Sequence, residues 1–184
     1  MFIGYYWSKR QENREECGQL LSDVLREMSA SHDVFRTWYV KGRTKKSSFE
    51  RIDMTTGPLT SCFESNRNDY DLTEIKELGF TAALWNGNNE FSVSIGATLG
   101  GYSEYVRNSL VIQLPPRDKV ERQLSENVLR DLFKKLVERI RPNDGAITSN
   151  SYLDRMVAMP WEAGWLVYNS RIGRVEERAS MADL

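Results

Sequence analysis

The sequence predicts a single α+β domain in which two long amphipathic helices pack on a mainly antiparallel sheet. A chain of 184 residues has the size of one domain and can bury a full hydrophobic core without a disulfide or a metal. Its β-prone runs gather around a hairpin signal instead of alternating with helices, which argues against a parallel α/β sheet. Two long apolar stripes with helical spacing complete the pattern.

The chain begins with an aromatic run from Phe2 to Trp7 that predicts the first strand. A helix is expected from about Arg10 to Ser29, with Ser8 as its N-cap. Its buried face is predicted from one continuous stripe of apolar side chains at helical spacing, formed by Cys17, Leu20, Leu21, Val24, Leu25 and Met28.

The next segment is harder to assign. Residues 34–40 are strand-like in composition, but their aromatic side chains are also compatible with a short irregular helix, and a basic loop follows from Lys41 to Lys46. Pro58 is expected to start a short helix, because proline is accepted in a first helical turn. A brief acidic helix is expected from Leu72 to Leu78, with Gly79 after its end.

The second half of the chain carries clearer patterns. Asn86-Gly87 separates Phe80 to Trp85 from Phe91 to Leu99, which predicts a hairpin with one buried face. Further strands are expected at residues 109–114, 146–148 and 165–168, and a long helix from about Asp118 to Arg141. Residues 1–170 are expected to form the domain, and residues 171–184 a polar, flexible tail.

Composition excludes several classes of protein. A net charge of −1, from 25 Lys and Arg against 26 Asp and Glu, argues against direct nucleic-acid binding. No apolar run approaches the ~20 residues of a membrane-spanning helix, and the N-terminus lacks the pattern of a signal peptide. With two cysteines and one histidine, neither a Cys/His metal site nor a cofactor is expected. A reduced, cytoplasmic protein is the prediction, and its oligomeric state stays open.

No catalytic motif is found. The glycines of residues 95–101 lack the Lys-Ser/Thr of a phosphate-binding loop, and the fragment Glu74-Ile75-Lys76 falls on an expected helix rather than on the strand that a nuclease motif needs. Cys17 belongs to the buried stripe of the first helix, where it acts as a small apolar residue. We therefore expect a binding protein and not an enzyme. A small enzyme with a non-obvious site and an effector adaptor or chaperone are the alternatives.

The charges are unevenly distributed along the chain. Residues 41–51 are basic and residues 68–90 are acidic, so the two stretches either pair with each other or offer an acidic surface to a basic partner. The densest acidic cluster is the candidate binding site, formed by Asp69, Asp71, Glu74 and Glu77. Glu74 and Glu77 are expected on one face of the short helix. The two aspartates have a structural alternative, which is to stabilise the N-terminus of that helix.

Five short blocks stand out between about Phe2 and Tyr168. They are IGYYWSKR at 3–10 with the following EEC at 15–17, WYVKGR at 38–43, ELGF at 77–80 before LWNG at 84–87, NSLVIQLP at 108–115 and GWLVY at 164–168. In this order they resemble the immunity protein 52 family. The resemblance implies a cognate antitoxin of a bacterial polymorphic toxin, typically a type VI secretion effector with a restriction-endonuclease-like nuclease domain. Such proteins bind the toxin and catalyse nothing, so no catalytic residues are carried over.

Overall fold

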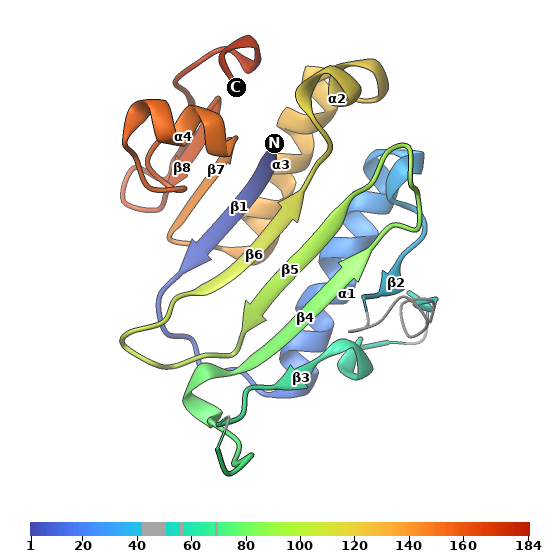
Figure 1. The fold of residues 1–184 in the computed structure, drawn as a ribbon, viewed down its shortest axis with the longest axis vertical. Coiled ribbons are helices and arrows are strands. Elements are labelled where there is room, and N and C mark those ends of the chain that lie inside the picture. The colour runs from blue at the N-terminus through green and yellow to red at the C-terminus, as the bar shows by residue number, and fades with distance from the viewer. Residues whose placement is uncertain (42–50, 56, 69) are drawn as a thin grey trace.

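The computed structural model describes residues 1–41, 51–55, 57–68 and 70–184. Within these residues nine strands form one antiparallel sheet in the order β2-β4-β5-β6-β1-β7-β8-β9, and β3 also pairs with β4 (Figure 1). The strands are β1 (Phe2–Trp7), β2 (Tyr39–Val40), β3 (Glu64–Ser65), β4 (Phe80–Trp85), β5 (Ser94–Leu99), β6 (Asn108–Gln113), β7 (Asp144–Thr148), β8 (Leu166–Asn169) and β9 (Arg174–Glu177). The predicted α+β class and antiparallel sheet are confirmed.

Two helices, α1 (Arg14–Ser31) and α3 (Glu126–Ile140), pack against each other behind the sheet (Figure 1). Two shorter ones are α2 (Arg117–Gln123) and α4 (Asn150–Met156). Tyr5 of β1 faces α3, since its ring stacks on Phe133 with the ring centroids 5.4 Å apart. Because side chains alternate along a strand, the main core lies between this face and the helices, and Tyr6 points to the opposite face.

The start of α1 differs from the sequence prediction. The helix begins at Arg14, and its N-cap is Asn13, not Ser8. The Asn13 side chain accepts hydrogen bonds from the N–H groups of Glu15 and Glu16, while the Glu16 carboxylate accepts one from the Asn13 N–H. This reciprocal pair satisfies more of the free donors at the helix start than Ser8 alone would. Ser8 instead donates to Asn143.

The expected long helix from Asp118 to Arg141 is wrong as one element, because it is divided into α2 and α3. Leu124 adopts an extended conformation between them, and the hydroxyl of Ser125 accepts a hydrogen bond from the N–H of Val128 as the N-cap of α3. A serine can compete for backbone donors in this way, and here it starts a new helix. The apolar stripe is confirmed, since Leu129, Leu132, Phe133, Leu136, Val137 and Ile140 are all buried.

The hairpin of β4 and β5 is confirmed, with Phe80 opposite Leu99 and Trp85 opposite Ser94. Its loop is longer than predicted, because β5 begins at Ser94 and not at Phe91. The Asn86 side chain accounts for this: it donates to the Phe91 carbonyl and accepts from the Val93 N–H, so residues 86–93 close on themselves. Gly87 has the positive φ that the pattern predicts, +74°.

Three other segments can be compared with their predictions. Residues 34–40 combine both alternatives, with a 3₁₀ turn at Asp33–Phe35 followed by β2. After Pro58 a single 3₁₀ turn forms at Thr60–Cys62. The basic loop lies, apart from Lys41, outside the described residues.

The C-terminal segment is anchored more closely than its polar sequence indicates. β9 pairs with β8, and the Glu177 carboxylate accepts a hydrogen bond from the Trp165 indole while it also pairs with Arg130 of α3. Met181 is 2% exposed. These contacts connect β9 and Met181 to the rest of the domain.

Strand register gathers several loops at one end of the sheet. Strands β1, β5 and β8 end there, and strands β4, β6 and β7 begin there. The register shows this: Trp7 at the end of β1 lies opposite Asn108 at the start of β6, and Leu99 at the end of β5 lies opposite Phe80 at the start of β4. Asp144, the first residue of β7, lies opposite both Tyr6 and Asn169. We call this the loop end; its connections are residues 8–13, 66–79, 100–107, 141–143 and 170–173. Both chain termini lie at the other end (Figure 1). Among the described helices, none has the length and apolarity needed to cross a membrane.

Candidate functional site

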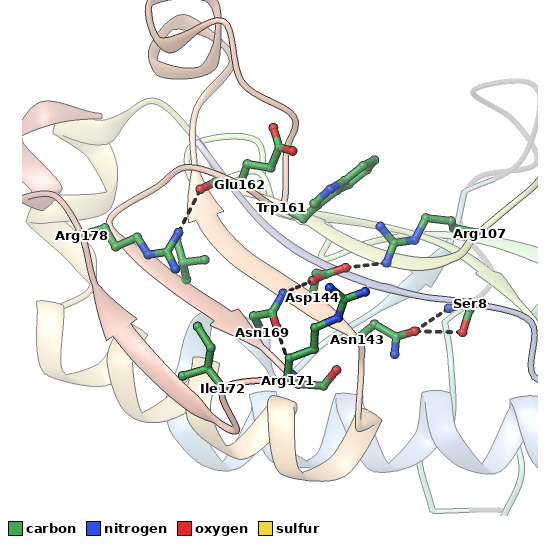
Figure 2. Close-up of a pocket in the computed structure, with 12 residues that line it drawn as sticks. Ser8, Arg107, Asn143, Asp144, Trp161, Glu162, Asn169, Arg171, Ile172 and Arg178 are labelled. Atoms are coloured by element: carbon green, nitrogen blue, oxygen red, sulfur yellow. Dashed lines mark hydrogen bonds and ion pairs between the residues drawn. The ribbon is translucent and has the colours of Figure 1, made fainter.

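At the loop end lies a hollow of about 780 Å³ that we call the arginine hollow (Figure 2). Its wall comes from the ends of β1, β6, β7 and β8 and from the segment that follows α4. The residues that give it chemical character are Arg107, Asn143, Asp144, Trp161, Arg171 and Arg178. Glu162 also lines the hollow, so three arginines and two carboxylates, those of Asp144 and Glu162, contribute to its charge.

Asp144, the first residue of β7, organises one side of the hollow. One of its carboxylate oxygens pairs with the Arg107 guanidinium at 2.5 Å, and the other accepts a hydrogen bond from the Asn169 amide at 2.8 Å. The Asp144 side chain is only 15% exposed. A carboxylate removed from water to this extent needs such partners, and in return it fixes Arg107 and Asn169 at the ends of β6 and β8.

Trp161 forms the opposite wall. Its ring packs edge-on against Tyr6, with 5.2 Å between the ring centroids, and the Arg107 guanidinium lies 4.7 Å from the Trp161 centroid. Gly4 permits this arrangement, since a Cβ there would lie 2.6 Å from the Tyr6 hydroxyl oxygen. Burial raises the pKa of Tyr6, and Arg107 opposes the shift only in part. The phenol is therefore neutral at physiological pH.

Arg171 differs from the other arginines of the hollow. Arg107 is paired with Asp144 and Arg178 with Glu176, whereas Arg171 makes no ion pair within the described part of the chain. Its backbone N–H donates to the Asn169 side chain at 2.9 Å, which holds the turn after β8. Figure 2 shows its side chain directed back over Asn143 and Asp144, toward the space that Arg107 also enters. Among the described residues the hollow thus has two available guanidinium groups: that of Arg171, which makes no ion pair, and that of Arg107, which contacts Asp144 through one nitrogen.

The candidate acidic residues lie elsewhere on the loop end. Asp69 lies outside the described residues, while Asp71, Glu74 and Glu77 are exposed. The expected helix from Leu72 to Leu78 is wrong: only Lys76–Leu78 forms a 3₁₀ turn, and Glu74 pairs with Arg67 in an isolated β-bridge. Gly79 does follow its last residue, as predicted.

The helix expected from Leu72 to Leu78 is absent because of local hydrogen bonds around Asp71. Its carboxylate accepts from both the hydroxyl and the N–H of Thr73, which hold the pKa of Asp71 below its usual value. Leu72 consequently has φ of +59°, which is incompatible with a helix. Glu74 and Glu77 therefore do not share a helix face, and no helix begins near Asp71 that its charge could stabilise.

Two exposed tyrosines accompany these carboxylates. We call the described residues 70–78, which carry Asp71, Glu74 and Glu77, the acidic loop. Tyr70 in this loop is 98% exposed, and Tyr105 in the loop before β6 is 95% exposed. The two loops are joined, because the Glu77 carbonyl accepts hydrogen bonds from the N–H groups of Tyr102 and Ser103 at 2.9 and 3.0 Å. These bonds therefore hold residues 102–103 beside Glu77.

Sequence reasoning found the acidic loop but missed the arginine hollow. Its residues come from segments near positions 107, 144, 161 and 171, and only the strand order brings them together. The only signal available in the sequence is Trp161, a large aromatic residue outside every predicted strand. The interpretation of Cys17 as a core residue is confirmed: the side chain is buried, and burial raises the pKa of its thiol to about 12.

These features define the chain as a one-domain α+β protein whose loop end carries an acidic loop with exposed tyrosines and a hollow lined by three arginines. The family model of immunity protein 52 matches residues 1–177, nearly the whole chain. The protein therefore belongs to the immunity protein 52 family, as its motifs indicate. No curated protein matches the sequence.

Proposed function

We propose that this chain neutralises a cognate toxin by binding it in a stoichiometric complex, without catalysis. The observation that carries the proposal is the family match over residues 1–177, because an immunity protein has a toxin as its partner. A cytoplasmic site of action is part of this proposal. A toxin of a type VI secretion or other polymorphic system is the partner we expect.

We further propose that the toxin is a nuclease and that the acidic loop contacts it. A surface that receives nucleic-acid phosphates is basic, and exposed carboxylates would be complementary to it. Asp71, Glu74 and Glu77 are exposed on a loop whose backbone is held by internal hydrogen bonds. Asp69 belongs to the same proposed contact by its place in the sequence. Such complementarity acts mainly on association rate and specificity.

Charge reversal tests this contact. In Glu74→Lys/Glu77→Lys, two attractive charges become repulsive, so association with the toxin encoded by the adjacent gene should slow by at least tenfold at low salt. The measurement is surface plasmon resonance with catalytically inactive toxin, together with growth of cells that co-express active toxin.

The matched control is Asp131→Lys/Glu138→Lys, which changes the same charge on the exposed face of α3. It should bind and protect as the original chain does. Full protection and unchanged rate constants for the Glu74/Glu77 variant would exclude the acidic loop as the inhibitory surface. An original chain that neither binds nor protects would contradict the proposed function itself.

A further inference from the structure

We propose that the arginine hollow receives a carboxylate side chain, an Asp or Glu, that projects from the toxin. The inference rests on the proposed function and adds a second contact of opposite charge to it. Its starting point is Arg171, whose guanidinium has no ion pair among the described residues although it lines a hollow. A guanidinium binds a carboxylate through two parallel N–H donors, which makes an acidic side chain its natural counterpart.

The other residues of the hollow favour an anionic group bound in one defined position over a loosely associated counter-ion. Arg107 is held by Asp144 and by the face of Trp161, so it cannot swing away into solvent. Only one of its nitrogens contacts Asp144, so the Arg107 guanidinium keeps further N–H donors that a ligand in the hollow can use. Trp161 supplies an apolar wall for the methylene groups of an Asp or Glu. A hollow of about 780 Å³ has room for such a side chain.

The place of the arginine hollow on the loop end favours a protein as the source of the carboxylate. The loop of residues 100–107 carries Arg107 at one end and, at the other, Tyr102 and Ser103, which donate to the Glu77 carbonyl of the acidic loop. Tyr105, 95% exposed, lies between them. The acidic loop, this tyrosine and the arginine hollow therefore follow one another along the loop end. Exposed tyrosines are typical anchors of protein interfaces.

Such a bipolar surface has a consequence for the partner. A toxin that presents a basic patch to the acidic loop must also place an acidic residue over the arginine hollow. If the toxin docked in the reversed orientation, like charges would face each other at both contacts, which would disfavour that orientation. The hollow thus fixes the orientation of the complex, and a toxin without the projecting carboxylate should be recognised poorly.

The test compares Arg171→Glu with Lys135→Glu, which introduces the same change of charge on the exposed face of α3. Binding to the catalytically inactive toxin of the adjacent gene is measured by surface plasmon resonance, and folding by thermal melting. Arg171→Glu should dissociate at least tenfold faster, with an unchanged melting curve, because the Arg171 side chain makes no hydrogen bond or ion pair within the described residues and is exposed. Lys135→Glu should match the original chain within twofold.

Two results would overturn the inference. One is an Arg171→Glu variant that binds as tightly as the original chain, which leaves the proposed function intact but removes the hollow from the interface. The other is calorimetric titration in which inorganic phosphate binds the original chain but not Arg171→Glu, while both bind the toxin equally; the hollow would then be a site for a free anion. If the original chain does not bind the toxin, the proposed function fails first.

Discussion

Two carboxylates at the loop end, those of Asp144 and Glu12, differ in how many of their oxygens have a partner. Both oxygens of the largely buried Asp144 carboxylate have partners, in Arg107 and Asn169. Glu12 pairs with Arg10 through one oxygen, but its Oε2 atom is buried without a hydrogen-bond partner among the described residues. Burial raises the pKa of Glu12 in spite of Arg10.

The raised pKa of Glu12 predicts that the stability of the fold depends on pH. Because the pKa of Glu12 is higher in the folded than in the unfolded chain, the folded state binds more protons above the ordinary value of 4.5, and stability falls as pH rises through the raised pKa. Glu12→Gln removes this loss, so the variant should gain stability relative to the original chain between pH 4 and pH 7. Urea unfolding at several pH values measures the difference.

Glu104→Gln provides a control of opposite sign. The hydrogen bond and charge of Lys9 hold the pKa of Glu104 below its usual value, so this pair stabilises the fold only above the unfolded pKa. The variant should therefore lose stability relative to the original chain as pH rises, by a small amount because the pair is exposed. A Glu12→Gln difference that stays constant with pH would contradict the account of Glu12.

At the scale of elements, α3 carries much of the core. Its buried stripe faces the sheet, and Phe133 stacks on Tyr5 of the central strand β1. The stripe was predictable from sequence because burial of a helix face imposes a period of 3.6 residues. The start of α3 was not predictable from the sequence. The apolar spacing around Ser125 fits an uninterrupted helix, and only the hydrogen bond that the Ser125 hydroxyl accepts from the Val128 N–H shows that a new helix starts there.

Leu132→Ala tests the contribution of this helix. Leu132 is fully buried in the middle of the α3 stripe, so its truncation removes apolar contact and leaves a cavity, at a cost of ~2–5 kcal/mol in the free energy of unfolding. Asp131→Ala, on the exposed face one position earlier, should change it by less than ~0.5 kcal/mol. Urea denaturation measures both, and equal effects would show that Leu132 does not face the core.

For the whole molecule, local patterns predicted the elements but not the site that their assembly creates. The alternation of Phe91, Val93, Ile95 and Ala97 with polar residues predicts a buried face, because side chains along a strand point alternately to its two sides. All four side chains are buried, although only Ile95 and Ala97 lie in β5, and Phe91 and Val93 belong to the loop before it. The acidic loop was visible as a run of charges, whereas its conformation depends on the Asp71–Thr73 hydrogen bonds, which compete with a helix. The arginine hollow depends on strand order, which no local pattern contains.

The central claim, inhibition by stoichiometric binding, is tested most directly by titration. Purified chain is added to a fixed concentration of the cognate toxin, well above the dissociation constant, and the residual activity of the toxin is recorded. We expect activity to fall linearly and reach zero at one chain per toxin, with a complex of that composition on size exclusion. Full activity at a large excess of the chain would contradict the account, as would complete loss at far less than one chain per toxin, since that requires catalysis.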